Sequence, residues 1–296
     1  MLDDHNIKLD KENAAPLGGQ RFLLVLRKLY SRPASALGTS IFIIFIFLAV
    51  FGPLVTPYTA TEQISNAALQ SPSADHWFGT DNLGRDVFSR VIVGAREILL
   101  LAGLGTLLSV IFGTSLGLLS GYRGGWFDET LMRFFDSLLA LPAMLLALLL
   151  LGTLGPSTNS ILIVLVVVYT PIVARVTRSV VLDVKNKAYV EAARLQGEST
   201  SRIIFGEILP PVLPTLAVES ALRFSYAIFL VAALGFLGIG VQPPNPNWGL
   251  MVKETRNFVS QSPWALYSPV IAISITIIGV NLMADGLKQL LESGDR

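Results

Sequence analysis

Residues 79–86 have the glycine spacing of a loop that could hold a nucleotide phosphate. They read G-T-D-N-L-G-R-D, whereas a phosphate-binding loop reads G-x4-G-K-[ST], with a lysine for the phosphates and a hydroxyl for magnesium. Here Arg85 replaces the lysine, and Asp86 puts a carboxylate where the hydroxyl should be. Because that carboxylate would repel a triphosphate, the sequence predicts that this chain does not bind ATP.

Glu219 and Arg223 are charged residues in an otherwise apolar stretch. They are four positions apart with the acid first, which places them on one face of a helix in the favourable order for an ion pair. One interpretation, which we favour, is a mutually neutralised pair that fixes helix packing. The other is part of the lining or gate of a translocation path, since charges within a membrane are costly and often functional.

The other residues that could do chemistry are few. The chain has no cysteine, which excludes disulfides, thiolate metal sites and a cysteine nucleophile. His5 and His76 lie far apart in the sequence, without acidic neighbours arranged for a metal, so neither is predicted to be a ligand. The net charge of +1 gives no reason to expect nucleic acid as a partner.

A polar stretch with the composition of a docking loop runs from Glu191 to Pro210 and reads E-A-A-R-L-Q-G-E-S-T-S-R-I-I-F-G-E-I-L-P. We expect a short helix over 187–196, capped by Asn186 and ended by Gly197 in the left-handed conformation. A second helix is expected to start at Ser199 or Thr200, and three prolines should separate it from the next apolar stretch. The residues predicted to contact a partner are Ala188, Glu191, Ala192, Ala193, Leu195, Gly197 and Ser199.

The composition indicates a membrane protein: 52% of the residues are hydrophobic and 15% are charged, against about 25% charged in soluble domains. Apolar stretches of about 20 residues are long enough to cross a bilayer as helices. The sequence therefore predicts an all-α protein with six transmembrane helices. The predicted spans are Leu37–Val55, Ile98–Leu119, 136–154, 160–176, Leu213–Gly240 and Ala265–Met283. Pro142 and Pro171 can kink the third and fourth spans, and the Gly113-x3-Gly117 spacing favours close helix packing.

The basic residues predict the orientation. With the amino terminus inside, 16 of the 22 lysines and arginines fall in cytoplasmic segments and 5 in external ones, which agrees with the positive-inside rule. Both termini are then cytoplasmic, and Glu219 and Arg223 lie near the cytoplasmic end of the fifth span. The predicted organisation is a cytoplasmic tail (1–36), a first transmembrane helix (37–56), an external segment (57–97), a five-helix core (98–288) with a cytoplasmic loop at about 179–212, and a cytoplasmic tail (289–296).

The E-A-A-x3-G-x10-I-L-P pattern resembles the coupling loop of the permease subunits of ATP-binding-cassette (ABC) importers. Trp77–Asp86 and the residues that follow resemble the external segment of permeases of the dipeptide, oligopeptide and nickel class, in particular the second of the two paired subunits. The chain departs from that class after Asn281–Leu287, where an aspartate-proline pair is usual and Lys288–Glu292 stands instead. The resemblance also covers Phe51–Leu54, Ala233–Gly240, Gln242–Pro244 and Trp248–Gly249.

This resemblance implies a non-catalytic permease subunit in the plasma membrane of a prokaryote, which is the inner membrane if the cell is Gram-negative. It implies peptides or metal chelates as cargo. The implied partners are a homologous permease, two cytoplasmic ATPase subunits that bind ATP and magnesium, an external solute-binding protein and membrane lipid. Two alternatives stay open on the sequence alone: a secondary transporter driven by an ion gradient, and a membrane scaffold without transport activity.

Overall fold

The structure, a computed structural model, describes residues 27–293. Within that range the chain consists of helices joined by turns and two longer non-helical segments, 56–86 and 238–247, which confirms the all-α prediction. The helices are α3 Pro33–Val55, α4 Val87–Arg123, α5 Gly125–Leu139, α6 Ala143–Leu154, α7 Thr158–Val184, α8 Ala188–Leu195, α9 Thr200–Arg202, α10 Leu209–Leu237, α11 Trp248–Thr255 and α12 Pro263–Ser293, with a π-helical stretch Ile203–Ile208 between α9 and α10.

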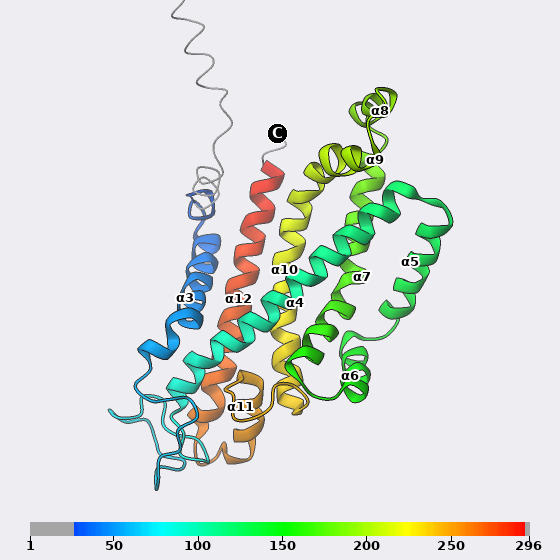
Figure 1. The fold of residues 1–296 in the computed structure, drawn as a ribbon. Helices are drawn as coiled ribbons and strands as arrows, with labels where there is room; N and C mark the ends of the chain where they lie inside the picture. The colour runs from blue at the N-terminus through cyan, green and yellow to red at the C-terminus, as the bar shows by residue number, and fades with distance from the viewer. Residues whose placement is uncertain (1–26, 294–296) are drawn as a thin grey trace, which may run out of the picture.

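The long helices form a bundle (Figure 1). Helices α3, α12, α10 and α7 run side by side, and α4 crosses them obliquely with its most extensive contact on α7. Helix α8 lies at the end of the bundle where α3 begins and α12 ends, whereas α11 and the 56–86 segment lie at the opposite end. The two ends of the bundle therefore carry different structures, as expected of a membrane protein whose two faces meet different partners.

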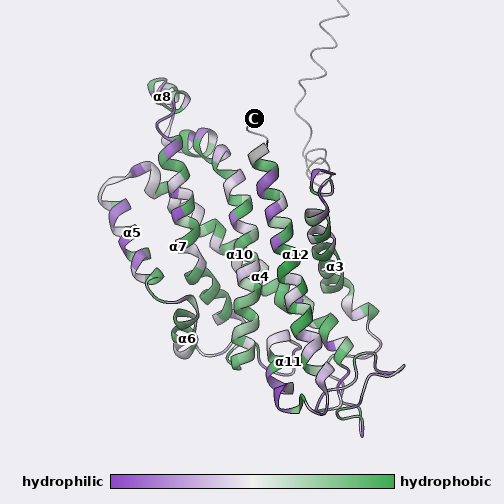
Figure 2. Cartoon of the chain, turned by 180° about the vertical axis from the view of Figure 1, so that it is seen from behind, coloured by the Kyte–Doolittle hydropathy of each residue, from purple (hydrophilic) through white to green (hydrophobic). Residues whose placement is uncertain are grey.

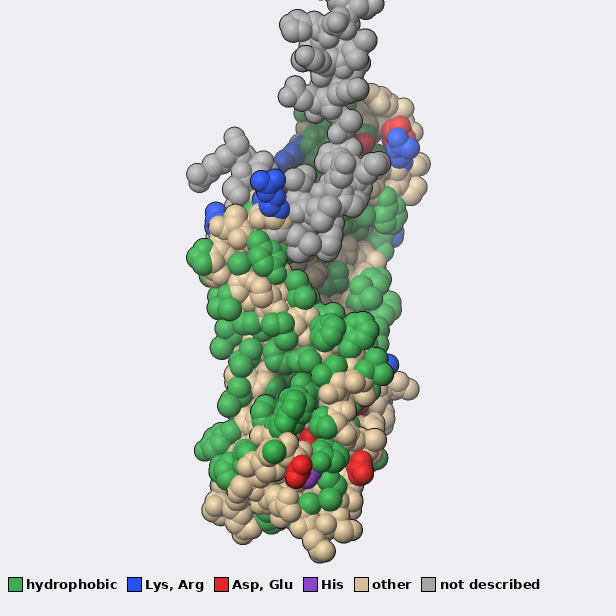
Figure 3. Space-filling view, turned by 90° about the vertical axis from the view of Figure 1, so that its left-hand side faces the viewer, with side chains coloured by type: hydrophobic (Ala, Val, Ile, Leu, Met, Phe, Trp, Pro, Cys, Tyr) green, Lys and Arg blue, Asp and Glu red, His purple; other side chains and the backbone are tan. Residues whose placement is uncertain are grey.

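The distribution of polar side chains agrees with a membrane crossing. Hydrophobic residues cover the middle of the long helices, while α5, α8, α11 and the 56–86 segment carry most of the hydrophilic ones (Figure 2). On the face that carries α3, a hydrophobic band lies between charged side chains at the two ends (Figure 3). Lipid can cover such a band, whereas water would leave it unfavourably exposed.

In the described part of the chain, five helices are long and apolar enough to cross a membrane, and a sixth crossing needs α5 and α6 together. These two helices meet at 91°, so the predicted third span over 136–154 is wrong as a single helix. The break falls at Pro142, which lacks an N–H and keeps the residue before it out of the helical conformation. The expectation that Pro142 interrupts this span is confirmed.

The second span starts earlier than predicted. Helix α4 begins at Val87 rather than at Ile98, because the Asp86 side chain caps it by accepting a hydrogen bond from Ser89 N at 2.7 Å. The last part of the 57–97 segment is therefore helical. The predicted tails are also shortened: α3 begins at Pro33 and α12 continues to Ser293, while the rest of both tails lies outside the described residues.

The prolines before the fifth span do not separate it from the loop, and that prediction is wrong. Pro210 and Pro211 closely follow the π-helical stretch Ile203–Ile208, and Pro214 lies inside α10. The chain stays helical from Thr200 to Leu237. A movement of the loop would therefore reach α10 through continuous helix.

Small residues bring α4 and α7 into close contact, as the Gly113-x3-Gly117 spacing predicted. A Cβ atom on Gly113 would lie 2.6 Å from Cβ of Val173, and one on Gly117 would lie 2.5 Å from the carbonyl oxygen of Ala174. Real Cβ contacts are not this short, so a side chain at either position would push the helices apart. The crossing positions the end of α7 from which the loop with α8 starts.

Candidate functional site

The loop that carries α8 is built by local capping. Helix α8 begins after Lys187 and has no side-chain cap, so the prediction of Asn186 as its cap is wrong: the Asn186 amide instead donates to the carbonyl oxygen of Leu182 at 3.5 Å. Gly197 has φ of 76°, which confirms the left-handed residue that ends the helix. Ser199 caps α9 by accepting a hydrogen bond from a backbone N–H of that helix at 3.4 Å.

One face of α8 points away from the protein. Leu195, at the end of the helix, is 85% exposed, which is unusual for a leucine that no lipid or partner covers. Ala193, also predicted to contact a partner, is buried and faces the rest of the chain. The predicted contact residues on the exposed surface are Ala188, Glu191, Ala192, Leu195, Gly197 and Ser199.

The opposite face of α8 packs on the start of the fifth membrane span. Val190 and Ala193 belong to a hydrophobic cluster with Ile203, Ile204 and Ile208 of the π-helical stretch. Val190 and Ile208 are fully buried. Helix α8 and the beginning of α10 therefore form one packed unit.

Polar contacts tie the same unit to α4. The Arg194 guanidinium lies 5.1 Å from the ring centroid of Tyr122, within range of a cation–π interaction. Lys185 donates from Nζ to the carbonyl oxygen of Gly121 at 2.8 Å. These contacts join α8 and the end of α7 to the end of α4, and no periodic pattern in the sequence predicts them.

A bidentate ion pair links α5 to α7 near the loop. Arg178 donates from Nε and Nη2 to the two carboxylate oxygens of Asp128 at 2.5 and 2.6 Å. Arg175 forms a second ion pair with Asp136. Paired, planar contacts of this kind fix relative orientation as well as distance. We therefore expect α5 to move together with α7.

Glu219 and Arg223 form the predicted ion pair, with Arg223 Nε 2.7 Å from Glu219 Oε1. The pair lies in the middle of α10, since Arg223 is fourteen positions from both Leu209 and Leu237. A cavity of about 430 Å³ opens beside it between α6, α7 and α10. The sequence identified the pair but not the cavity.

At the other end of the bundle, four charged side chains form a buried cluster. Arg85 donates to Asp81 at 2.6 Å and to Glu254 at 2.7 Å, and Arg90 lies 3.6 Å from Asp81 and 3.3 Å from Glu254. Two positive and two negative groups balance each other. The cluster fastens the 56–86 segment to α4 and α11.

The G-x4-G segment takes part in this cluster and does not form a phosphate cradle. The backbone N–H groups of Leu83 and Arg85 donate to the Asp81 carboxylate at 2.9 and 3.0 Å. Those of Gly79 and Gly84 donate to backbone carbonyls within the segment. The amides that would hold phosphate oxygens are thus already used, which supports the prediction that no ATP binds here.

His76 has an acidic partner that the sequence analysis missed. Its Nδ1 lies 2.9 Å from Oδ1 of Asp86, and both side chains are buried. Asp86 therefore caps α4 and holds His76 at the same time. Residues 27–293 contain no group of three or more histidines and acids that could hold a metal, and His5 lies outside the described range.

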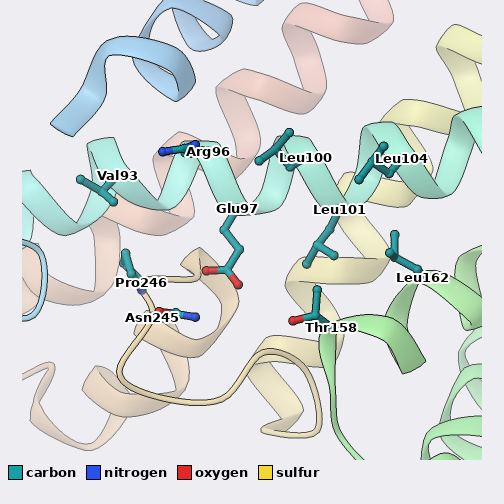
Figure 4. A pocket seen from close by; sticks show the side chains of 10 residues that line it. All are labelled: Val93, Arg96, Glu97, Leu100, Leu101, Leu104, Thr158, Leu162, Asn245 and Pro246. Carbon is teal, nitrogen blue, oxygen red and sulfur yellow. The ribbon is translucent and has the colours of Figure 1, made fainter. Parts of the chain in front are cut away.

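A second cavity, of about 390 Å³, opens where α4, the start of α7 and the 245–246 turn meet (Figure 4). The Glu97 side chain extends from α4 into this space towards Asn245, whereas Arg96 turns away from it (Figure 4). Leucines of α4 and α7 form the apolar walls. The cavity lies towards the end of the bundle that carries α11.

Comparison with known proteins identifies the family. The profile of the "binding-protein-dependent transport system inner membrane component" family matches residues 113–294, and that of the "N-terminal TM domain of oligopeptide transport permease C" matches residues 21–72. The chain belongs to this family of ABC importer permeases. It is a non-catalytic, multi-pass subunit of the plasma or inner membrane, and it works with an ATPase, a binding protein and a partner permease.

The relatives are permeases of peptide transport systems. The dipeptide transport system permease protein DppC of Alkalihalophilus pseudofirmus is 41% identical, over 90% of this chain and 88% of that protein. The di/tripeptide permease DppC of Pseudomonas aeruginosa is 40% identical over 89% of each chain. The glutathione permease GsiD of Pectobacterium atrosepticum is 35% identical, over 89% and 88% of the two chains.

An inward-facing structure of the MetNI methionine ABC transporter shares the fold, with a TM-score of 0.56 over 70% of the permease and 97% of that chain, at 15% identity. These findings confirm the predicted family, the membrane fold and the role as a transport subunit. They exclude the secondary transporter and the scaffold as alternatives.

Proposed function

We propose that this permease forms one half of a translocation pathway for short peptides and that α8 is the dock for an ATPase subunit. The observation that carries the docking proposal is the two-sided packing of α8: Val190 and Ala193 hold it on the chain, while Glu191 and Leu195 project from it. The exposed alanines would let a partner backbone approach closely. ATP and magnesium would be bound by that partner.

The packing supports a path for the coupling movement. A force on α8 would reach α10 through the cluster of Ile203 and Ile208, and α4 through Arg194 and Tyr122. The Asp128–Arg178 pair would carry it to α5. In this proposal two ATPase subunits bind the coupling loops of this chain and of a homologous permease, and an external binding protein delivers cargo to the end that carries α11 and the 56–86 segment.

The proposed cargo is di- and tripeptides, including glutathione-like ones, because the relatives named above carry peptides. The test uses the importer reconstituted with its permease partner, ATPases and binding protein. We expect ATP-dependent uptake of a labelled dipeptide, which excess unlabelled dipeptide reduces and excess nickel does not. Uptake of nickel without uptake of any peptide would contradict the proposed cargo.

We also propose that α8 and both termini lie in the cytoplasm. The chain has no cysteine, so single cysteines report position. His76 is a poor site because it is buried, whereas Ser71 and Glu198 are exposed at opposite ends of the bundle. In intact cells, an impermeant thiol reagent should label Ser71→Cys and should label Glu198→Cys only after the membrane is opened. The reverse pattern would overturn the orientation and the docking proposal with it.

A further inference from the structure

The cavity beside Arg223 has an unusual combination of charge and apolar wall. Arg223 lies about 21 Å along α10 from either end of that helix, at 1.5 Å per residue. The cavity is formed by α6, α7 and α10, and its lining includes Met144, Tyr169, Tyr226 and Phe229. A guanidinium group is thus placed at mid-helix in a space walled by aromatic rings.

Part of that guanidinium has no protein partner. Its Nε faces Glu219, and its central carbon lies 4.9 Å from the ring centroid of Tyr226 and 5.9 Å from that of Tyr169. Within residues 27–293, neither Nη group of Arg223 makes a hydrogen bond. Arg223 is one of the residues that line the cavity, and a guanidinium carries a planar pair of donors that suits a carboxylate.

Lipid cannot cover this face at low cost. The free energy of placing a charged side chain in the middle of the bilayer is unfavourable, and such residues therefore face protein or water. Tyr226 and Phe229 lie on the same side and are 55% and 60% exposed. The α6–α7–α10 face therefore meets the water-filled path or the partner permease.

We infer that this cavity is a carboxylate-binding site within the translocation path and that it binds the terminal carboxylate of a peptide. Arg223 would bind the carboxylate, and Glu219 would position Arg223. The inference rests on the proposed function and adds the group that the path recognises. Every unmodified peptide carries that carboxylate whatever its sequence. The aromatic walls contact side chains without selecting one type.

The ion pair also explains how the carboxylate-binding site would release its cargo. Glu219 neutralises Arg223 when the cavity is empty, so a carboxylate that binds the Nη groups shares Arg223 with Glu219. A guanidinium that already has an acidic partner attracts a second carboxylate less strongly than an unpaired one would, since the two carboxylates repel each other. Binding is then weak enough for passage.

The test measures reactivity of a single cysteine in the assembled importer. Met144→Cys lines the cavity from α6, and Leu149→Cys, on the same helix and outside the cavity, is the matched control. An anionic sulfonatoethyl methanethiosulfonate should modify Met144→Cys about tenfold faster than its cationic trimethylammonium counterpart, because its sulfonate can accept hydrogen bonds from the Nη groups of Arg223. At Leu149→Cys the charge of the reagent should make no such difference.

Variants of Arg223 then identify the source of the preference. Arg223→Gln should abolish or reverse the preference for the anionic reagent, because it leaves Glu219 without its partner. Arg223→Lys should retain the preference, since it keeps a positive charge at this position. With ATP present, binding protein loaded with a dipeptide should slow the modification of Met144→Cys. Binding protein loaded with the C-terminal amide of the same dipeptide should not slow it.

Three results would overturn the inference: no reaction with either reagent, a preference that persists in Arg223→Gln, or equal protection by the amide. ATPase activity stimulated by the loaded binding protein is measured on the same samples. If that stimulation persists while the preference for the anionic reagent at Met144→Cys is absent, the carboxylate-binding site is refuted and the proposed function as an importer subunit is not.

Discussion

Leu195→Glu is expected to abolish ATP-driven uptake while leaving the amount of permease in the membrane unchanged. Leu195 is 85% exposed and lies outside the hydrophobic cluster that holds α8, so its replacement costs the chain little stability. In the proposed dock, the same change buries an unpaired carboxylate against the ATPase, which is strongly unfavourable. Uptake of labelled dipeptide and the quantity of permease in purified membranes measure the two effects.

Leu195→Met is the matched control, because it keeps an apolar side chain of similar volume and should retain most of the uptake. Gly197 offers a second comparison. Its φ of 76° strains any β-branched residue, while nothing lies within 4 Å of an added Cβ. Normal uptake by Leu195→Glu, with the ATPases still bound, would show that α8 is only a connector.

Arg85→Gln is expected to destabilise the end of the molecule that carries α11. The Arg85 and Asp81 side chains are each 4% exposed, and removal of the Arg85 guanidinium leaves Arg90 as the one positive charge of the cluster beside the carboxylates of Asp81 and Glu254. Loss of one partner from a buried ion pair costs about 3–5 kcal/mol. We therefore expect a lower thermal unfolding midpoint of the purified complex and faster proteolysis within residues 56–86.

An exposed ion pair on α5 provides the control. Arg133 and Glu129 are 2.6 Å apart with 76% and 63% exposed side chains, so Arg133→Gln should change stability by less than about 1 kcal/mol. Equal thermal shifts in Arg85→Gln and Arg133→Gln would contradict a structural role for the buried cluster.

The sequence predicted the elements that local chemistry determines. Uncharged stretches of membrane length correspond to the long helices, and Gly197 ends α8 as its position after a short helix indicated. The errors also have local causes. Proline disrupts most helix interiors and so predicts a break, but the helix continues through Pro210 and Pro211, which closely follow the π-helical stretch Ile203–Ile208. The phosphate-loop pattern does not indicate the role of Asp86, whereas its position before a hydrophobic run predicts a helix cap.

Contacts between residues far apart in the chain could not be predicted from one sequence. Asp128 and Arg178 are separated by 50 positions, and Arg85 and Glu254 by 169. No spacing rule brings such pairs together, since their meeting depends on how α4, α5, α7 and α11 pack. The same holds for the cavity beside Arg223, whose walls come from three helices. The Glu219–Arg223 pair was predictable because both residues lie on one turn of one helix.

Crosslinking from position 195 tests the docking of α8 most directly. Leu195→Cys places one thiol at the exposed end of α8 in a chain that has no other cysteine, and Leu149→Cys on α6 serves as the control. In membranes that hold the whole importer, a short thiol-to-amine crosslinker should join Leu195→Cys, and not Leu149→Cys, to the ATPase subunit. Crosslinking of position 195 to lipid or to the partner permease, with no ATPase product, would contradict the proposed dock.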